Sequence, residues 1–248
     1  MDVLETQQVT KIYHADSAPI EALRGVDCSV RRGEFVAITG PSGCGKSSLL
    51  HLLGGIDLPT SGRVTLEGTD LAALSEDERA ILRRRRIGFV FQSFNLLPTL
   101  TAAENVSLPL LLDGVTQTAA LTRAVAALEA VGMEKRSSHR PSMLSGGEQQ
   151  RVAVARALVT EPAVILADEP TGNLDSVNGR HVMSLLRAFT DLKQQTVVVV
   201  THDLAIAESA DRIIRMRDGL IEADAAGPAE RPLPESQPVE FKRVPLRP

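Results

Sequence analysis

The sequence predicts an α/β protein with a mostly parallel sheet, a helical insert and an antiparallel β portion at its N-terminus. Two near-continuous apolar runs, residues 163–170 (AVILADEP) and 196–203 (TVVVVTHD), are typical of parallel strands covered on both faces. A third run, residues 34–40 (EFVAITG), leads into a glycine-rich turn and an expected helix from Lys46 to about Leu53. From about Thr101 to Leu158 the pattern is helical.

Shorter β-type runs occur before and between these segments. The N-terminal part contains TQQVTKIY, the segment from Ile20 to Val30, and GRVTLEG, all of which read as strands. Residues 87–92 (IGFVFQ) predict another apolar strand that ends in a glutamine. Residues 212–221 (RIIRMRDGLI) continue the sheet pattern after the helical part.

The helical insert is expected over residues 99–160, inside one domain that covers residues 1–224. Within the insert, Leu121, Val125, Leu128 and Val131 recur at spacings of three and four after a possible N-cap at Thr118. Residues 225–248 are rich in proline and poor in large apolar side chains, which predicts a flexible tail.

Composition excludes several classes of protein. The 27 basic and 31 acidic residues leave a net charge of -4, unlike the strongly basic footprint of a nucleic-acid binder. Cys28 and Cys44 are too few for a disulfide framework and fit a reducing compartment. The N-terminus lacks a signal-peptide pattern. The sequence also contains no run of 18 or more apolar residues, which is the length needed to span a bilayer. We therefore expect any membrane role to be delegated to a partner.

Residues 40–47 (GPSGCGKS) match the phosphate-loop pattern G-x-x-x-x-G-K-[ST]. Glycines allow backbone N–H groups to turn around phosphates, and the helix that follows adds the positive end of its dipole. We expect Lys46 to reach the β and γ phosphates of ATP, and the Ser47 hydroxyl to bind Mg²⁺. The expected nucleotide contacts are Gly40, Pro41, Ser42, Gly43, Cys44, Gly45, Lys46, Ser47 and Ser48.

Two consecutive carboxylates follow one of the buried strands. Asp168 comes at the end of VILAD, where it could hold Mg²⁺ beside the phosphate loop. Glu169 is next and should point the other way along the strand. It is a candidate general base for the attacking water.

Residues 144–150 (LSGGEQQ), together with the phosphate loop, resemble the signature of the ATP-binding cassette (ABC) superfamily. Ser145, Gly146 and Gly147 start a helical stretch, so they form a second phosphate-binding helix N-terminus in one chain. The resemblance covers nearly all of residues 1–222. It implies a P-loop NTPase core with an ABC fold. It also implies a homodimer in which the signature of one subunit closes on the nucleotide of the other.

The remaining motifs of the family occur in order. Tyr13 matches the aromatic residue that stacks on adenine, and Gln92 matches the Q-loop glutamine that contacts Mg²⁺. Asp175 in GNLDS matches the D-loop at the dimer interface. His202 in VVTHD matches the switch histidine, expected near the γ-phosphate. By resemblance, Lys46, Glu169 and His202 serve catalysis, while Ser47, Gln92 and Asp168 hold the metal ion.

A narrower resemblance comes from FVFQSFNLLPTLTAAENV and TGNLD. These segments are similar to the exporter and lipoprotein-release group of ABC ATPases (MacB and LolD types), which includes the cell-division FtsE type. The resemblance implies a membrane permease partner of the FtsX, MacB or LolC kind and a place at the cytoplasmic face of the membrane. It implies export or extraction of a substrate. An FtsE-like mechanotransmission role and a polar amino-acid importer remain alternatives.

A run of four arginines, Arg83 to Arg86, precedes the IGFVFQ strand. We expect a solvated helix end there. Contact with anionic lipid headgroups or with the partner is the alternative.

Overall fold

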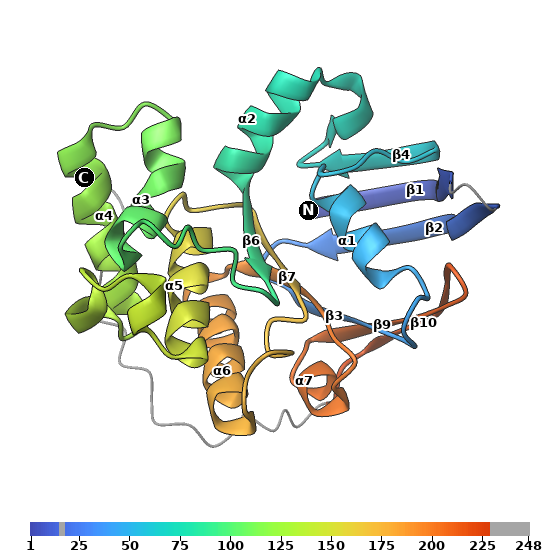
Figure 1. Cartoon of the computed structure of the whole chain (residues 1–248). Helices are drawn as coiled ribbons and strands as arrows, with labels where there is room; N and C mark the ends of the chain where they lie inside the picture. Colours follow the sequence, from blue (N-terminus) through green and yellow to red (C-terminus); the bar gives the residue numbers. More distant parts are fainter. Residues whose placement is uncertain (15–17, 229–248) are drawn as a thin grey trace. The chain divides into compact units, whose positions relative to one another are not determined.

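The computed structural model describes residues 1–14 and 18–228, which form two compact units (Figure 1). Unit 1 consists of the described residues up to 83 and from 189 onward, and unit 2 consists of residues 84–188. Each unit has its own strands and helices. The α/β class, with parallel strands and an antiparallel N-terminal sheet, is confirmed.

An antiparallel sheet occupies the N-terminal part of unit 1. Its strands follow the order β2-β1-β4-β5, with these bounds: β1 (Asp2–His14), β2 (Pro19–Arg31), β4 (Ser61–Leu66) and β5 (Thr69–Asp70). In register, Leu4 of β1 lies opposite Val30 of β2 and Leu66 of β4. All three side chains are buried. This row of apolar residues across three strands stabilises one face of the sheet.

The parallel strands of unit 1 carry its deepest core. Strand β3 (Phe35–Thr39) lies between β8 (Thr196–Val200) and β9 (Arg212–Arg217) and is parallel to both. Every residue of β3 and β8 is buried, as the continuous apolar runs predict. Strand β10 (Leu220–Ala226) pairs antiparallel with β9.

Residues 212–221, where the sheet pattern was expected to continue, contain β9, a tight turn and the start of β10. The turn residues Asp218 and Gly219 have φ values of 48° and 79°. Two consecutive residues with positive φ make the tight turn for which Asp-Gly is favoured. The Asp-Gly pair therefore reverses the chain between β9 and β10.

Helix α1 (Lys46–Leu53) has the bounds that the sequence predicts. Leu49, Leu50, Leu52 and Leu53 are all buried. The helix packs against the antiparallel sheet and against β8, within unit 1 (Figure 1). Helix α7 (Leu204–Glu208) packs on β3 and is capped by Asp203, whose carboxylate accepts the N–H of Ala205.

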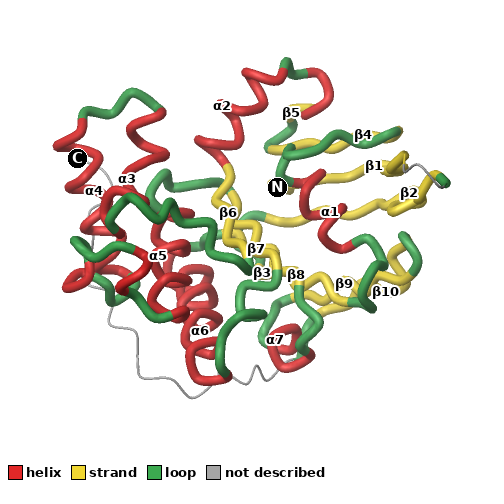
Figure 2. The backbone as a smooth tube through the Cα atoms, viewed as in Figure 1, coloured by secondary structure: helices red, strands yellow, loops and turns green. Residues whose placement is uncertain are grey.

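Unit 2 combines two parallel strands with three mutually packed helices (Figure 2). Their bounds are β6 (Ile87–Phe91), β7 (Val164–Asp168), α3 (Ala102–Leu112), α4 (Gln117–Ala130) and α5 (Gly146–Leu158). Helix α5 packs directly on β6. A side chain added to Gly88 of β6 would overlap the carbonyl oxygen of Ala157, so this glycine permits the close approach.

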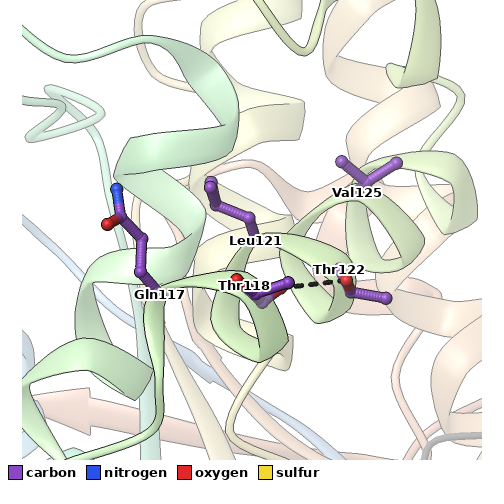
Figure 3. Close-up of a pocket in the computed structure, with 5 residues that line it drawn as sticks. All are labelled: Gln117, Thr118, Leu121, Thr122 and Val125. Atoms are coloured by element: carbon purple, nitrogen blue, oxygen red, sulfur yellow. Dashed lines mark hydrogen bonds between the residues drawn. The ribbon is translucent and has the colours of Figure 1, made fainter.

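Helix α4 differs from its expected form. Its N-cap is Thr116, and Thr118 is the second residue inside the helix. The buried face consists of Ala120, Ala124, Ala127 and Leu128. Small residues let neighbouring helices approach closely, so the alanine face is covered by α3 and α5. Leu121 and Val125 instead line a surface hollow with Gln117, Thr118 and Thr122 (Figure 3). The expected apolar stripe is therefore only half buried.

The described residues also form the helices α2 (Glu76–Arg86) and α6 (Ser176–Lys193) and the short 3-10 turns η1 (Leu71–Ala73), η2 (Glu134–Arg136) and η3 (Pro141–Met143). The arginine run ends α2. Arg83 donates to the carbonyl of Gly55 at 2.5 Å. Arg84 and Arg85 both bind the Asp113 carboxylate, at 2.8 and 2.7 Å. Arg83 and Arg84 are partly buried, so the expectation of a solvated helix end is wrong for these two, whereas the Arg85 side chain is 57% exposed.

The expected tail, residues 225–248, falls largely outside the described residues, which end at residue 228. Its first two residues end strand β10. Among the described residues, no helix combines the length and apolar character that a bilayer crossing requires.

Candidate active site

In unit 1, the phosphate loop connects the carboxyl end of β3 to the start of α1. Gly40 and Gly45 have φ values of 148° and 102°, in the region that favours glycine. Neither has room for a side chain. A Cβ on Gly40 would overlap the carbonyl oxygen of Met216, and one on Gly45 would overlap that of Ala22. The glycines are therefore required by the fold of the loop as well as by any bound phosphate.

Lys46 begins helix α1 and is only 8% exposed. Its Nζ donates to the carbonyl oxygens of Gly40 and Pro41, both at 2.9 Å. No side chain caps the N-terminus of α1. The first N–H groups of a helix have no partner within the helix and carry its positive dipole end. The loop therefore combines an ammonium group with a helix N-terminus, which suits a phosphate.

Tyr13 lies near the end of β1 and is 37% exposed. Its hydroxyl donates to Asp57 Oδ2 (3.3 Å) and lies 3.5 Å from Ser48 Oγ. Lys11 lies over the ring, 5.0 Å from its centroid, and forms a 2.7 Å ion pair with Asp57. Burial raises the pKa of Asp57, but hydrogen bonds from Lys11 and from the N–H of Leu58 outweigh it, so the pKa lies below its usual value. An ionised Asp57 thus holds both the ring and the ammonium group beside it.

His202 lies just after the carboxyl end of β8, the strand paired with β3, which leads into the phosphate loop. The β3–β8 pairing continues one residue beyond β8, because the N–H of Thr201 donates to Ile38 O at 3.1 Å. His202 therefore follows β8 at the same edge of the sheet at which Gly40 follows β3. Thr201 Oγ1 also accepts the N–H of Asp203, which fixes the backbone on either side of the histidine. Unit 1 thus brings together the phosphate loop, Tyr13 and His202.

In unit 2, Gln92 and Glu169 follow the ends of two paired strands. Phe91 of β6 lies in register with Asp168 of β7. Gln92 and Glu169, each the next residue, therefore leave the sheet side by side. The Gln92 amide donates to Asn173 Oδ1 (3.3 Å), and the Asn173 amide donates to Gln92 O (3.0 Å). This reciprocal pair ties the Q-loop to the segment after Glu169.

The expectation that Glu169 continues the strand is wrong. Strand β7 ends at Asp168, so the alternation of side chains along a strand does not reach Glu169. Glu169 has a φ of 44°, a left-handed conformation that is uncommon outside glycine. The N–H of Gly172 donates to Glu169 O (3.0 Å), closing a turn. The direction of the carboxylate is therefore set by this turn. Such strained positions are concentrated at functional sites.

The signature residues start helix α5, as the sequence predicts. Ser145 is the N-cap, and Glu148 completes a capping box. Ser145 Oγ accepts the N–H of Glu148 (3.3 Å), and the Glu148 carboxylate accepts the N–H of Ser145 (2.8 Å). A hydroxyl that accepts one hydrogen bond can still donate its own proton. Ser145 can therefore cap its helix and donate to a phosphate at the same time.

Asp175 and the signature are connected through one asparagine. The Asp175 carboxylate accepts the N–H groups of Val177 and Asn178 at 3.0 Å, and the Asn178 amide at 2.6 Å. The Asn178 side chain lies where a Cβ on Gly147 would be. Gly147 is therefore required by Asn178, in the same unit. No sequence pattern singles out Asn178, or Lys11 and Asp57 beside Tyr13, because each contacts a motif residue only once the chain has folded.

The donor types suit Mg²⁺. Among the described residues, no three His, Cys, Asp or Glu side chains gather into a metal site. The residues expected to hold the ion, Ser47, Gln92 and Asp168, offer a hydroxyl, an amide and a carboxylate oxygen. Mg²⁺ prefers such hard oxygen ligands and is commonly held by one or two protein groups plus phosphates. Gln92 makes its bond to Asn173 through the amide nitrogen, so the oxygen that a metal would bind is not used in that bond.

The family of the chain is evident from comparison with known proteins. Residues 23–172 match the family described as "ABC transporter". An uncharacterized ABC transporter ATP-binding protein of Thermotoga maritima is 51% identical over 220 residues, which are 89% of this chain and 94% of that protein. The lipoprotein-releasing system ATP-binding protein LolD of Legionella pneumophila is 47% identical over 221 residues, covering 89% of this chain and 97% of LolD.

Other relatives are longer. The macrolide export ATP-binding/permease protein MacB of Brucella melitensis is 49% identical over 222 residues, which are 90% of this chain. The match spans 34% of MacB, about a third of its length. Among solved structures, a dimeric post-hydrolysis state of the ATP-binding cassette MJ0796 bound to ADP and Pi has a TM-score of 0.83. It is 44% identical and covers 90% of this chain and 98% of that chain.

Proposed function

This chain belongs to the ABC transporter family as an ATP-hydrolysing subunit, and we propose that two copies close on two ATP molecules to drive a separate membrane permease. One observation carries the proposal. The chain has two helix N-termini suited to phosphate, one at Lys46 and the other at Ser145, and they belong to different compact units. Pairing two chains head to tail would give each nucleotide one of each kind.

Unit 1 would bind the nucleotide. The phosphate loop and the N-terminus of α1 surround the phosphates, with Lys46 moving from its own loop carbonyls to the β and γ phosphates. Tyr13 stacks on the adenine through the exposed part of its ring. His202, which follows β8 at the sheet edge where the phosphate loop begins, donates to the γ-phosphate.

Unit 2 would supply hydrolysis. Glu169 accepts a proton from the attacking water, and its left-handed turn fixes where that carboxylate points. Ser47, Gln92 and Asp168 would hold Mg²⁺ with the phosphates. When bound, the ion neutralises charge between the β and γ phosphates. Lys46 and His202 would stabilise the remaining negative charge that develops on the γ-phosphate in the transition state.

The partner subunit would complete each site. The Ser145 hydroxyl donates its free proton to the γ-phosphate held by the other subunit, and the N–H groups of Gly146 and Gly147 add the dipole of α5. Asp175 orders the start of α6 at the interface between subunits. Opening and closing of this interface would transmit the energy of ATP to the permease.

For the direction of transport, we assign export or extraction of a substrate. This chain matches nearly the whole length of LolD, which by name belongs to a lipoprotein-releasing system. MacB is named for macrolide export. We assign this chain a permease of the FtsX, MacB or LolC kind and a place at the cytoplasmic face of the membrane. The neighbouring reading frame tests this assignment. A permease with four spans and a large external domain supports it, whereas an importer-type permease beside a solute-binding protein would contradict it.

The hydrolytic assignment is tested by Glu169→Gln. The phosphate loop is untouched, so ATP affinity should remain, whereas turnover should fall by about 10²–10⁴, the usual contribution of a general base. Because the change also removes a negative charge facing the γ-phosphate, ATP should trap a dimer visible by size-exclusion chromatography. Glu134→Gln, an exposed change of the same charge in η2, is the matched control. Near-normal turnover in Glu169→Gln would show that Glu169 is not the base.

A further inference from the structure

One buried glutamine contacts both strand ends that carry the hydrolytic residues. Gln150 is the fifth residue of helix α5 and is 0% exposed. Its amide donates to Phe91 O at 3.3 Å and to Pro170 O at 2.5 Å. Phe91 immediately precedes Gln92, and Pro170 immediately follows Glu169. A single side chain thus binds the backbone next to both residues.

The buried Pro170 carbonyl needs an outside donor, whereas Phe91 O also accepts the N–H of Phe94 at 3.2 Å. Phe91 is the last residue of β6, and Pro170 lies two residues beyond β7, where the ladder of the sheet has ended. Buried backbone acceptors are almost always paired. From the helix packed on β6, Gln150 supplies that pairing for Pro170 O and adds a second donor at Phe91 O. Without it, the turn at Glu169 would be held by the Gly172 N–H to Glu169 O bond and by the Gln92–Asn173 pair.

The orientation of the Gln150 amide is fixed by its surroundings. Both neighbouring groups are acceptors, so only the NH₂ end of the amide can face them. Gln150 Oε1 is buried, and no hydrogen-bond partner for it is found among the described residues. A buried unpaired oxygen is unfavourable for stability and requires a compensating reason. A leucine or methionine would fill the space without that penalty but would leave Pro170 O without this donor, so the glutamine is explained by its bonds to the two carbonyls.

We propose that Gln150 is a positioning residue for hydrolysis, which holds the Glu169 turn against the end of β6 through the Pro170 and Phe91 carbonyls. This role rests on the proposed function of Glu169 as general base. Gln150 would not touch ATP. It would affect the rate by fixing the direction of the Glu169 carboxylate and the start of the Q-loop. Its effect should therefore appear in kcat and leave nucleotide affinity unchanged.

The test is Gln150→Met, which keeps length and volume and removes the donor. We expect kcat to fall by about tenfold or more with the KM for ATP unchanged, as for a lost transition-state interaction. Gln150→Asn retains an amide on a shorter side chain that cannot span both carbonyls, and should also lower kcat. Gln195→Met is the matched control, because it also removes a glutamine bond to a backbone carbonyl, that of Thr196, away from the candidate site.

A double-mutant cycle separates positioning from a purely structural role. If Gln150 acts through Glu169, then adding Gln150→Met to Glu169→Gln should lower turnover no further. The proposal is overturned if both Gln150 variants turn over ATP within about twofold of wild type. It is also overturned if ATP affinity falls in step with kcat, or if the two substitutions are additive. Activity retained by Glu169→Gln alone would instead contradict the assignment of the base.

Discussion

Asn178 lies so close to Gly147 that the glycine could not carry a side chain without overlapping the Asn178 amide. Asn178 is in turn bound by Asp175, through both its backbone N–H and its side-chain amide. The signature and the D-loop of one chain are therefore interlocked. A substitution at Gly147 or at Asn178 should therefore alter the conformation of the other residue.

This contact predicts different effects of alanine at the two signature glycines. Gly147→Ala should destabilise the protein, because overpacking of this kind typically costs about 1–3 kcal/mol. Gly146→Ala should be tolerated in the fold, since its Cβ would meet Leu174 at 3.6 Å, an ordinary contact. Thermal unfolding of both variants measures the difference. In the double variant Gly147→Ala, Asn178→Ala, part of the lost stability should return, because Oδ1 and Cγ of Asn178 are removed while its Cβ, 2.9 Å from the added methyl group, remains. Equal melting temperatures for the two single variants would mean that space at Gly147 is not limiting.

Elements with a strong local signal were predictable from the sequence. Helix α1 has its expected bounds because a glycine-rich loop precedes Lys46 and a leucine-rich face follows it. The continuous apolar runs of β3, β7 and β8 are likewise buried parallel strands. The helix N-terminus at Ser145 follows from Ser and Glu at the spacing of a capping box.

What the sequence could not predict depends on tertiary contacts. Periodicity indicated a helix at α4 but the wrong buried face, because close packing selected Ala124 and Ala127 over Val125. The left-handed turn at Glu169 has no local signal, since a glutamate rarely adopts that conformation. The role inferred for Gln150 depends on two carbonyls 59 and 20 residues away, which no local pattern reveals.

Tyr13 offers a test of nucleotide binding that separates its ring from its hydroxyl. Tyr13→Ala removes the stacking surface, and stacking of a base on an aromatic ring is worth about 1–3 kcal/mol. Affinity for ATP, measured by calorimetry, should therefore fall by about 5- to 150-fold. Tyr13→Phe keeps the ring and loses only the bonds to Asp57 and Ser48, so its affinity should change much less. If both variants lose affinity equally, the hydroxyl rather than the ring is responsible.

Glu148 predicts a pH dependence of stability. The backbone N–H of Ser145 is the main cause of its lowered pKa, and Arg136 adds to it. A carboxyl whose pKa is lower in the folded state stabilises the protein above the unfolded value, about 4.3. This contribution is lost as the pH falls through the folded pKa.

Glu148→Gln should flatten that dependence. Glutamine at this position of a capping box can still accept the Ser145 N–H but does not titrate. At pH 7 the variant should be less stable by about 1 kcal/mol or less, the scale of a helix cap. Below pH 4 the difference should shrink, which urea unfolding at the two pH values would measure. A constant difference would show that the Glu148 charge does not contribute.

Mixing two inactive variants tests whether each ATP site is built from two chains. Lys46→Ala should lose ATP affinity, because charge-assisted contacts to phosphate are lost. Ser145→Arg should keep ATP binding in the monomer, since Ser145 would serve the nucleotide of the partner. It should block hydrolysis by placing a large cation at the N-terminus of α5. Loss of the Ser145 cap should cost about 1 kcal/mol, so melting temperature is measured alongside.

In a heterodimer of these two variants, the shared-site arrangement places both defects in one site and leaves the other intact. The Lys46 of the Ser145→Arg chain faces the normal Ser145 of the Lys46→Ala chain. Mixed samples should therefore regain ATPase activity that neither variant has alone, with a maximum near equal concentrations. If each chain built its own site, every site in the mixture would carry one defect and no activity would return. Loss of ATP binding by folded Ser145→Arg monomers would likewise contradict a site shared between subunits.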